Sequence, residues 1–463
     1  MNKYFRLMLL YVVITSLLMA CSSDKSGTYV LINAISQIDT SNKVQQLHEY
    51  DSPYTICYQN PDGTYSFYVF SSPIQYKTSN GYEIIDNTVV ESSDKNYTFE
   101  NKANNIKTYF PVSLSDSFKI AHNDDFLEFK VQDDVTGFSE AKKLMYTNMY
   151  GDIVSAVIYE RSDMDMVFYP TKAGIKSEIV LKEKTEVNQY IFSVTGNSNN
   201  YQNNQNGYIL FKDGKRNVGL IYAPLIKGTK EKYDEDGNNF SLHSTFDVVH
   251  ENNNYTVSVK IDDNLINNES TYPVKFDPSI ELYLSKQPDS GVYSKQEKTN
   301  SYLKSISIIG NSDSLGMGIQ YIRFRFNYFL SCDPNSVISS FYHIRSLSNF
   351  SSCEKIYIYK LNKDWSSTGL NWNNKIDYGE KITDQIIDKS KNIKFEITEF
   401  TKKCFSDKTW MTESNGVLLK GSDNNTYRVF TSSDNSLYSP YVEINLKSLP
   451  SSFTCREDIN PSN

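Results

Sequence analysis

Short segments in which apolar and polar residues alternate fill most of this chain, and turn-forming residues separate them. Asn80-Gly81, Asp213-Gly214 and Asp236-Gly237 each lie between two such segments. These dipeptides favour two-residue hairpin turns because both residues tolerate positive φ. No stretch keeps a helical period over several turns. The sequence therefore predicts an all-β fold in which closely spaced strands form antiparallel sheets.

Composition agrees with this fold class and limits the possible partners. The chain has 463 residues, enough for two or three domains, and its 35 Tyr and 25 Phe suit strands. The net charge is −8 and no basic block occurs, which argues against a nucleic-acid partner. Six Cys in this length are too few for a disulfide-based scaffold.

The N-terminus has the form of a secretory signal. Lys3 and Arg6 precede an apolar run, residues 7–18, that is too short to span a bilayer comfortably. The run ends in Leu-Met-Ala-Cys at Cys21, which resembles the lipobox of bacterial lipoproteins. The resemblance implies that residues 1–20 are removed and that Cys21 carries the lipid, anchoring the protein to the outer face of a bacterial membrane. The alternative is ordinary cleavage beside an incidental cysteine. Residues 21–45 would form a polar tether.

The first half of the mature chain carries four motifs in a fixed order. They are SSPIQYKTSNGYEIIDNTVV (71–90), ENKANNIKTYFP (100–111), KAGIKSEIVLK (172–182) and YPVKFDP (272–278). Together they resemble the β-rich module that precedes YD repeats in large wall-associated bacterial proteins. The resemblance implies a β-rich module over residues 46–284, as one body or as two subdomains.

The C-terminal third resembles a DNRLRE-type domain, a β-sandwich akin to a carbohydrate-binding module. The motifs are NSYLKSISIIG (300–310), QYIRFRF (320–326), SSFYHI (339–344), KIYIYKL (355–361), DWSSTGLNWNN (364–374), FEIT (395–398), GVLLK (416–420) and SPYVEI (439–444). The resemblance implies an antiparallel, jelly-roll-like sandwich over residues 285–447, followed by a tail, 448–463. We expect residues 285–301 to form an exposed linker before it.

Three positions depart from the family pattern. Glu396 stands where an Asp is usual, Lys375 follows the Trp-Asn-Asn motif in place of Pro, and Ser439 replaces an Arg. The carbohydrate link is an expectation inherited from the family.

Strand alternation suggests where a glycan would bind. Side chains two apart share a face of a strand, and the aliphatic faces should pack the core. The expected core positions are Ile322, Phe324, Phe326, Ile356 and Ile358. The outward set, our candidate glycan-binding residues, is Tyr321, Arg323, Arg325, Tyr357 and Tyr359. The alternative is an ordinary solvated sheet face.

Trp365 and Trp372 lie in the 364–374 motif, which reads as β-structure with a bend. Either ring could fill the sandwich core or serve as a platform for a sugar. Alternation with Leu370 favours a core position for Trp372, whereas Trp365 beside the SSTG turn is expected nearer the rim.

The sequence offers no catalytic motif, so we expect no enzyme activity, cofactor or metal site. The five His are scattered, and Asp163 with Asp165 supply too few oxygens for Ca²⁺. The leading function is attachment or glycan binding at the cell envelope. The alternatives are an adhesive protein that binds a protein partner and, less favoured, a polysaccharide-processing enzyme whose carboxylates meet only in the fold.

Cysteine spacing allows one local disulfide. Cys332 and Cys353 flank the SSFYHI segment, and a hairpin-like path would bring them to the same end of the sandwich. Cys57, Cys404 and Cys455 have no such spacing and are expected to be local staples or free thiols.

The Cys21→Ser substitution tests the anchor. We expect it to release the protein from membranes, because the acyl chains would supply the hydrophobic attachment. Fractionation with mass spectrometry of the mature N-terminus measures this. An unmodified Cys21 in the wild-type mature protein would refute the lipoprotein assignment.

Overall fold

The computed structural model describes residues 34–453, apart from single positions and short stretches, of which the longer ones are 228–239, 262–271, 283–288, 298–305 and 348–353. Within these residues the fold is all-β, as predicted, and every strand pairing is antiparallel. The helices are α3 (Thr398–Ser406), α4 (Lys408–Glu413) and five 3₁₀ turns: η1 (Ala34–Gln37), η2 (His48–Tyr50), η3 (Phe326–Phe329), η4 (Pro334–Ser336) and η5 (Trp372–Asn374). The signal segment and Cys21 lie outside the described residues.

Two sheets make up the first sandwich. The eight-stranded sheet has the order β21 (Ser244–Glu251), β22 (Asn254–Ile261), β15 (Gln189–Gly196), β10 (Asp125–Val131), β9 (Phe118–His122), β8 (Lys107–Phe110), β7 (Phe99–Ala103), β6 (Asp86–Glu91). The eleven-stranded sheet contains β11 (Lys142–Thr147), β12 (Ile153–Glu160), β13 (Met164–Pro170), β14 (Gly174–Leu181), β24 (Ser279–Leu282), β18 (Arg216–Tyr222), β17 (Tyr208–Asp213), β16 (Asn200–Asn204), β19 (Ile226–Lys227), β20 (Phe240–Ser241) and β23 (Val274–Phe276).

An aromatic cluster fills the centre of the first sandwich. The Phe118 ring from one sheet stacks on Phe129, with centroids 4.8 Å apart, and contacts Phe168 of the other sheet at 4.3 Å. All three rings are buried in one large apolar core. Alternation along β9, β10 and β13 places them inward, as the period of two requires.

The predicted turns form where the dipeptides indicated. Gly81 joins β4 (Gln75–Thr78) to β5 (Gly81–Ile84) with φ 122°, and Gly214 joins β17 to β18 with φ 59°. Both angles lie in the left-handed region that glycine adopts without steric cost. The Asp236-Gly237 turn lies outside the described residues.

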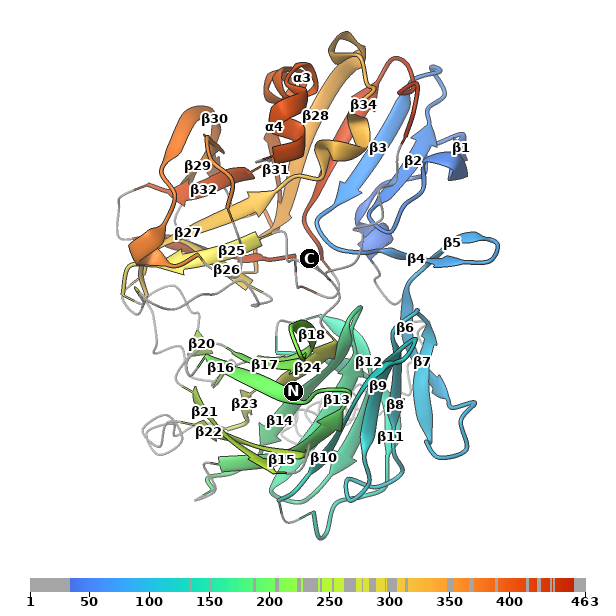
Figure 1. Cartoon of the computed structure of the whole chain (residues 1–463), viewed down its shortest axis with the longest axis vertical. Helices are drawn as coiled ribbons and strands as arrows, with labels where there is room; N and C mark the ends of the chain where they lie inside the picture. Colours follow the sequence, from blue (N-terminus) through green and yellow to red (C-terminus); the bar gives the residue numbers. More distant parts are fainter. Residues whose placement is uncertain are drawn as a thin grey trace, which may run out of the picture. The chain divides into compact units, whose positions relative to one another are not determined.

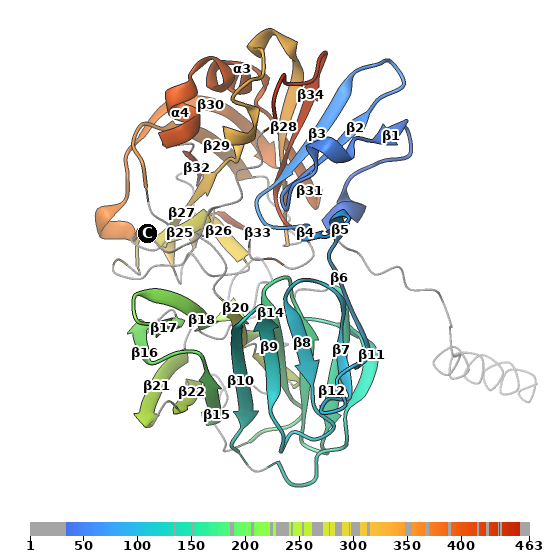
Figure 2. The ribbon, with the colours of Figure 1, turned by 45° about the vertical axis from the view of Figure 1, so that its right-hand side comes forward.

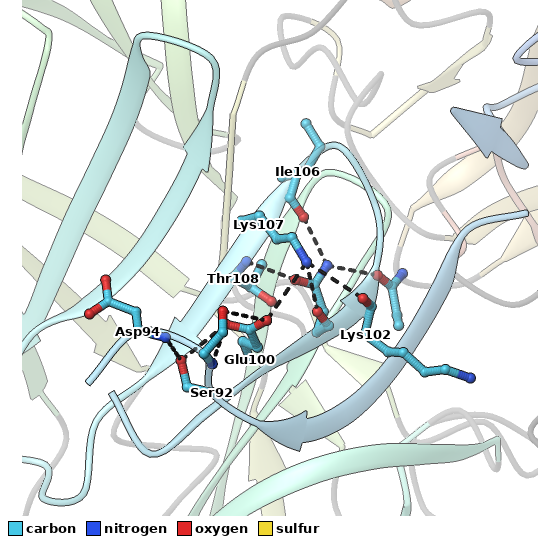
Figure 3. A network of polar contacts seen from close by, with 10 residues as sticks. Ser92, Asp94, Glu100, Lys102, Ile106, Lys107 and Thr108 are labelled. Carbon is cyan, nitrogen blue, oxygen red and sulfur yellow. Dashed lines mark hydrogen bonds and ion pairs between the residues drawn. The ribbon is translucent and has the colours of Figure 1, made fainter. Parts of the chain in front are cut away.

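A polar network explains the ENKANNIKTYFP motif (Figure 3). The buried Asn101 amide on β7 donates to the Ile106 carbonyl at 2.8 Å and accepts from the Thr108 amide at 3.0 Å. Glu100 accepts a hydrogen bond from Ser92 Oγ at 3.0 Å. The Asn101 bonds hold β7 to β8 and the Glu100 bond holds β7 to the chain after β6, so the motif is structural.

Two further sheets make up the second sandwich. The six-stranded sheet has the order β1 (Gln45–Gln46), β2 (Thr55–Gln59), β3 (Tyr65–Phe70), β34 (Tyr441–Leu446), β28 (Val337–Arg345), β31 (Asn392–Glu396). The seven-stranded sheet has the order β30 (Tyr378–Ile387), β29 (Glu354–Leu361), β32 (Gly416–Gly421), β27 (Gly316–Arg323), β26 (Ile306–Ser312), β33 (Tyr427–Thr431), with β25 (Asp289–Tyr293) paired to β27.

The sheets depart from the expected module boundary at residue 46. Strands β2 and β3 were expected in the first module, but β3 pairs with β34 over its whole length, from Tyr65 opposite Leu446 to Phe70 opposite Tyr441 (Figure 1, Figure 2). Phe67 and Val69 are buried in the core of the second sandwich. The C-terminal sandwich is therefore completed by a hairpin from the N-terminal part of the chain.

Two other expectations are corrected at the edges of the modules. Asp289–Tyr293, inside the expected linker, forms strand β25 and is buried along its length. Gln45–Gln46, at the end of the expected tether, forms strand β1 and pairs with β2. Both segments are held in place because their backbone N–H and C=O groups hydrogen-bond to a neighbouring strand.

The expected disulfide is not formed at Cys332. This residue, Cys57 and Cys404 are buried free thiols in the core of the second sandwich. Burial raises the pKa of all three thiols, which keeps them protonated and unreactive. The other expected partner, Cys353, lies outside the described residues, as does Cys455.

Phe67→Ala tests the shared sandwich. The substitution removes a fully buried ring from β3 and should cost roughly 3–5 kcal/mol. Tryptophan fluorescence reports on the second sandwich, because Trp365, Trp372 and Trp410 are the only Trp residues of the chain. We expect the fluorescence-detected melting temperature to fall. An unchanged fluorescence-detected melting temperature would indicate that residues 46–70 belong to the first module.

Candidate functional site

The outer face of the seven-stranded sheet combines a covered half and an open half. Inward residues of its strands, such as Ile322, Ile356 and Ile358, lie in the main core of the second sandwich, as predicted. Outward residues of β27 and β32, including Tyr321 and Leu418, belong to a separate apolar cluster. The rest of that cluster comes from Val292 of β25, from Leu361 and Tyr359 of β29, and from Trp365, Leu370, Trp372 and Ile376. We call the described residues of this last segment, 364–365 and 370–376, the strap.

The strap contacts Tyr321 and Arg323, which were predicted as ligands. The Tyr321 hydroxyl donates to the Ile376 carbonyl at 2.9 Å, and Arg323 Nη2 donates to the Trp365 carbonyl at 2.6 Å. Tyr321 is fully buried. These two outward side chains therefore fasten the strap to the sheet. Tyr321 is unavailable to a glycan, whereas the Arg323 side chain remains 34% exposed beside the strap.

The two strap tryptophans occupy positions opposite to those expected. Trp365 is 5% exposed and its ring lies 5.8 Å from Tyr321, whereas Trp372 is only partly buried. Both belong to the cluster on the outer face, not to the core between the sheets. A Cβ on Gly416 of β32 would lie 2.5 Å from Trp365 Nε1, so glycine there makes room for the indole.

The end of the strap is a 3₁₀ turn where the sequence predicted extended structure. Asn371 Oδ1 accepts from the amides of Asn373 and Asn374, and the Asn371 amide donates to Asn374 Oδ1 at 2.7 Å. This reciprocal pair is a capping box. The Asn-rich motif therefore ends the strap with a fixed turn and leaves Trp372 beside Lys375, whose Nζ lies 4.6 Å from the ring centroid.

Arg325 also differs from the prediction. Strand β27 ends at Arg323, so the alternation does not continue to residue 325. The Arg325 guanidinium instead stacks on the Tyr54 ring at 3.5 Å from its centroid. Tyr54 belongs to the main core of the second sandwich, which places Arg325 away from the outer face of the seven-stranded sheet.

The open half of this face carries a row of three tyrosines. Tyr357 and Tyr359 point outward from β29 as predicted, with ring centroids 6.2 Å apart. Tyr378 of β30 adds a third ring, 4.3 Å from Tyr359 and 43% exposed. We call these residues the aromatic row. Tyr378 was missed because its place beside Tyr359 depends on the bulged pairing of β29 with β30, which the sequence does not indicate.

Charged side chains border the aromatic row. Lys355 and Lys381 bind Asp384 at 2.6 and 2.5 Å, and their Nζ atoms lie 5.3 and 6.0 Å from the Tyr357 ring centroid. Hydrogen bonds from the two lysines lower the pKa of Asp384. Partial burial raises the pKa of Tyr359, with Tyr378 adding to the shift, so its phenol stays neutral and can donate a hydrogen bond. The row thus offers flat ring faces with polar groups at their edges.

Several carboxylates elsewhere are bound in structural pairs, whereas burial raises the pKa of Asp152 and of Asp289 to about 6. Asp163 accepts two hydrogen bonds from Arg161, and Asp165 pairs with Lys182 at 2.6 Å. Burial alone would raise the pKa of Glu443, but hydrogen bonds from His343 and Asn445 lower it to about 2. Within the residues that the structure describes, no group of three or more His, Cys, Asp or Glu side chains is arranged to hold a metal ion.

The comparisons with known proteins assign no family. No protein-family model and no curated protein matches the chain. Among solved structures, it is similar to an exo-β-1,3-galactanase of Phanerochaete chrysosporium with galactose, at 6% identity and a TM-score of 0.12, covering 82% of this chain and 100% of that one. A variant of that enzyme with β-1,3-galactotriose gives 6% identity and a TM-score of 0.13, covering 80% and 98%. Similarity this low supports no conclusion about fold or activity. Along the described part of the chain, no helix is long and apolar enough to cross a bilayer.

Trp365→Ala and Tyr378→Ala form a matched test of the two halves of this face. Trp365→Ala should cost about 3–5 kcal/mol, because it removes a buried ring and releases the strap. Tyr378→Ala should change stability little, because the residue is 43% exposed at the surface and leaves no buried cavity. Thermal unfolding followed by circular dichroism measures both. A Trp365→Ala protein as stable as Tyr378→Ala would contradict the buried position of the strap.

Proposed function

We propose that this protein is a non-catalytic glycan-binding protein held at the bacterial cell surface by a lipid on Cys21. The observation that carries the proposal is the aromatic row, in which the rings of Tyr357, Tyr359 and Tyr378 lie side by side on an open sheet face. Aromatic rings stack on the apolar faces of sugars while phenol and charged groups bind the hydroxyls. The resemblance of the C-terminal third to a DNRLRE-type sandwich supports the same function.

The charged border fits a binding role better than catalysis. Asp384 is the carboxylate bound to both lysines beside the row, and those hydrogen bonds lower its pKa, so it stays ionised and is a poor proton donor near neutral pH. A general acid would need a raised pKa, as in glycosidases. The row therefore supports recognition of a sugar surface without bond cleavage.

One observation favours a second candidate, binding of a protein partner. Strand β30 is at the end of the seven-stranded sheet, and Ile386 on it is 61% exposed. An open strand edge can pair with an extended segment of another protein. In that case the backbone of β30 would bind the partner, and the tyrosine rings would contribute little.

Binding measurements separate the two candidates. Residues 22–463 would be screened on a glycan array and the best ligand measured by calorimetry. Alanine at Tyr357, Tyr359 or Tyr378 should each weaken binding by about 1 kcal/mol, roughly fivefold, as expected for one aromatic contact.

Two control variants complete the comparison. Tyr109→Ala removes a ring that stacks with Tyr97, 5.0 Å away on the first sandwich, and should leave affinity unchanged. Gln385→Lys charges the β30 edge at an exposed residue that pairs with the inward-facing Ile356, so it should also leave glycan affinity unchanged while blocking strand addition. Glycan binding that survives alanine at all three tyrosines would rule out the row as the site.

A further inference from the structure

The chain enters the second sandwich across the outer face of the six-stranded sheet. Ile38, just after η1, is 7% exposed and packs in an apolar cluster with Ile35 partly buried beside it. The cluster's other members come from β2, β3, β34 and the β4–β5 hairpin: Ile56, Tyr58, Tyr68, Phe70, Ile74, Ile84 and Tyr441. The segment around η1 is therefore docked on this face.

Polar contacts fix the same segment a few residues later. Lys43 Nζ donates to Asn60 Oδ1 at 2.8 Å and to Ser66 Oγ at 2.9 Å, and it lies 5.7 Å from the Tyr68 ring centroid. The Val44 amide then donates to the Gln59 carbonyl at 2.9 Å, just before β1 begins. Apolar and polar contacts together hold residues 35–46, the docked segment, against the six-stranded sheet.

The aromatic row lies on the opposite side of this sandwich. The inward side chains of the six-stranded sheet, such as Phe67 and Val442, meet those of the seven-stranded sheet, such as Ile358 and Val417, in one core. The docked segment lies outside the first sheet, and the row lies outside the second. The whole thickness of the sandwich therefore separates the point of chain entry from the row.

The distance along the chain to Cys21 is short. Thirteen Cα steps join Cys21 to Ala34, and a chain of that length spans at most about 45 Å. Two sheets stacked about 10 Å apart, with side-chain layers outside both, are roughly 20 Å thick. A polar tether of this length has a root-mean-square span of only about 20 Å, so reaching the far face would require it to extend well beyond its average span. A lipid on Cys21 therefore favours an orientation in which the six-stranded sheet is the nearer one to the bilayer.

We propose that the docked segment turns the six-stranded sheet toward the membrane and the aromatic row away from it, so that the row binds a polysaccharide presented from outside the cell surface and not a lipid headgroup. This proposal rests on the proposed function for the nature of the ligand. The orientation itself depends only on the docked segment and on attachment of the chain near residue 21.

Energy transfer to labelled vesicles tests the orientation without any glycan. Residues 22–463 would be attached through an N-terminal hexahistidine tag to vesicles that contain nickel-chelating lipid and an acceptor dye on the lipid headgroups. A donor dye would replace either of two exposed lysines that lie over aromatic rings: Lys394, 3.6 Å from the Phe341 centroid on the six-stranded sheet, or Lys375 on the strap. We expect stronger energy transfer from position 394. Equal or reversed transfer would overturn the proposal.

Ile38→Asp provides the matched control, because a buried carboxylate should undock the segment while leaving both sheets intact. We expect the difference between the two donor positions to shrink in this variant. An unchanged difference would show that docking does not set the orientation and would overturn the proposal. If transfer stays stronger from position 394 than from 375 but the protein binds no glycan, the orientation holds and only the proposed function is refuted. Vesicle-bound protein should bind soluble glycan as tightly as free protein, and loss of binding on vesicles would place the row at the membrane.

Discussion

The pairing of β3 with β34 is the contact on which the second sandwich depends. It joins strands at Tyr65–Phe70 and Tyr441–Leu446, from opposite ends of the chain, and it places Phe67 and Val69 in the core. Because side chains alternate along a strand, this register also decides that Tyr68 and Phe70 point outward and receive the docked segment. One pairing thus completes the core, fixes the point of chain entry and leaves the outer face of the other sheet open.

That other face is divided by a single segment of chain. The strap lays Trp365 and Leu370 over Tyr321 and Leu418, forming a second apolar layer outside the sheet. Gly416 permits the close approach of the Trp365 indole, since any Cβ there would collide with it. The strap cluster reaches β29, where it buries Leu361 and packs against Tyr359, and beyond it Tyr357, the rest of Tyr359 and Tyr378 form the aromatic row. The boundary between structural and available aromatic residues on this face is therefore set by where Trp365 and Leu370 pack.

Two carboxylates of the second sandwich, Glu443 and Asp384, are held in local pairs with basic side chains. Glu443 is ionised because His343 and Asn445 donate to it, which offsets the cost of its partial burial. Asp384 is held in the same way by Lys355 and Lys381. A carboxylate with satisfied partners and a lowered pKa, such as Asp384 beside the row, is suited to fixing structure or binding hydroxyls, not to transferring protons. The proposed function accordingly relies on the tyrosine rings.

The sequence by itself determined the fold class, the hairpins at Gly81 and Gly214, and the alternation that places Ile356 and Ile358 inward with Tyr357 and Tyr359 outward. These features depend on turn chemistry and on a period of two, both of which are local. Only the tertiary structure decided that β3 completes the C-terminal sandwich, that the strap contacts Tyr321 and Arg323, and that Tyr378 joins the row. Alternation tells which side of a sheet a residue faces but not what packs over it, because covering segments and strand partners come from distant parts of the chain.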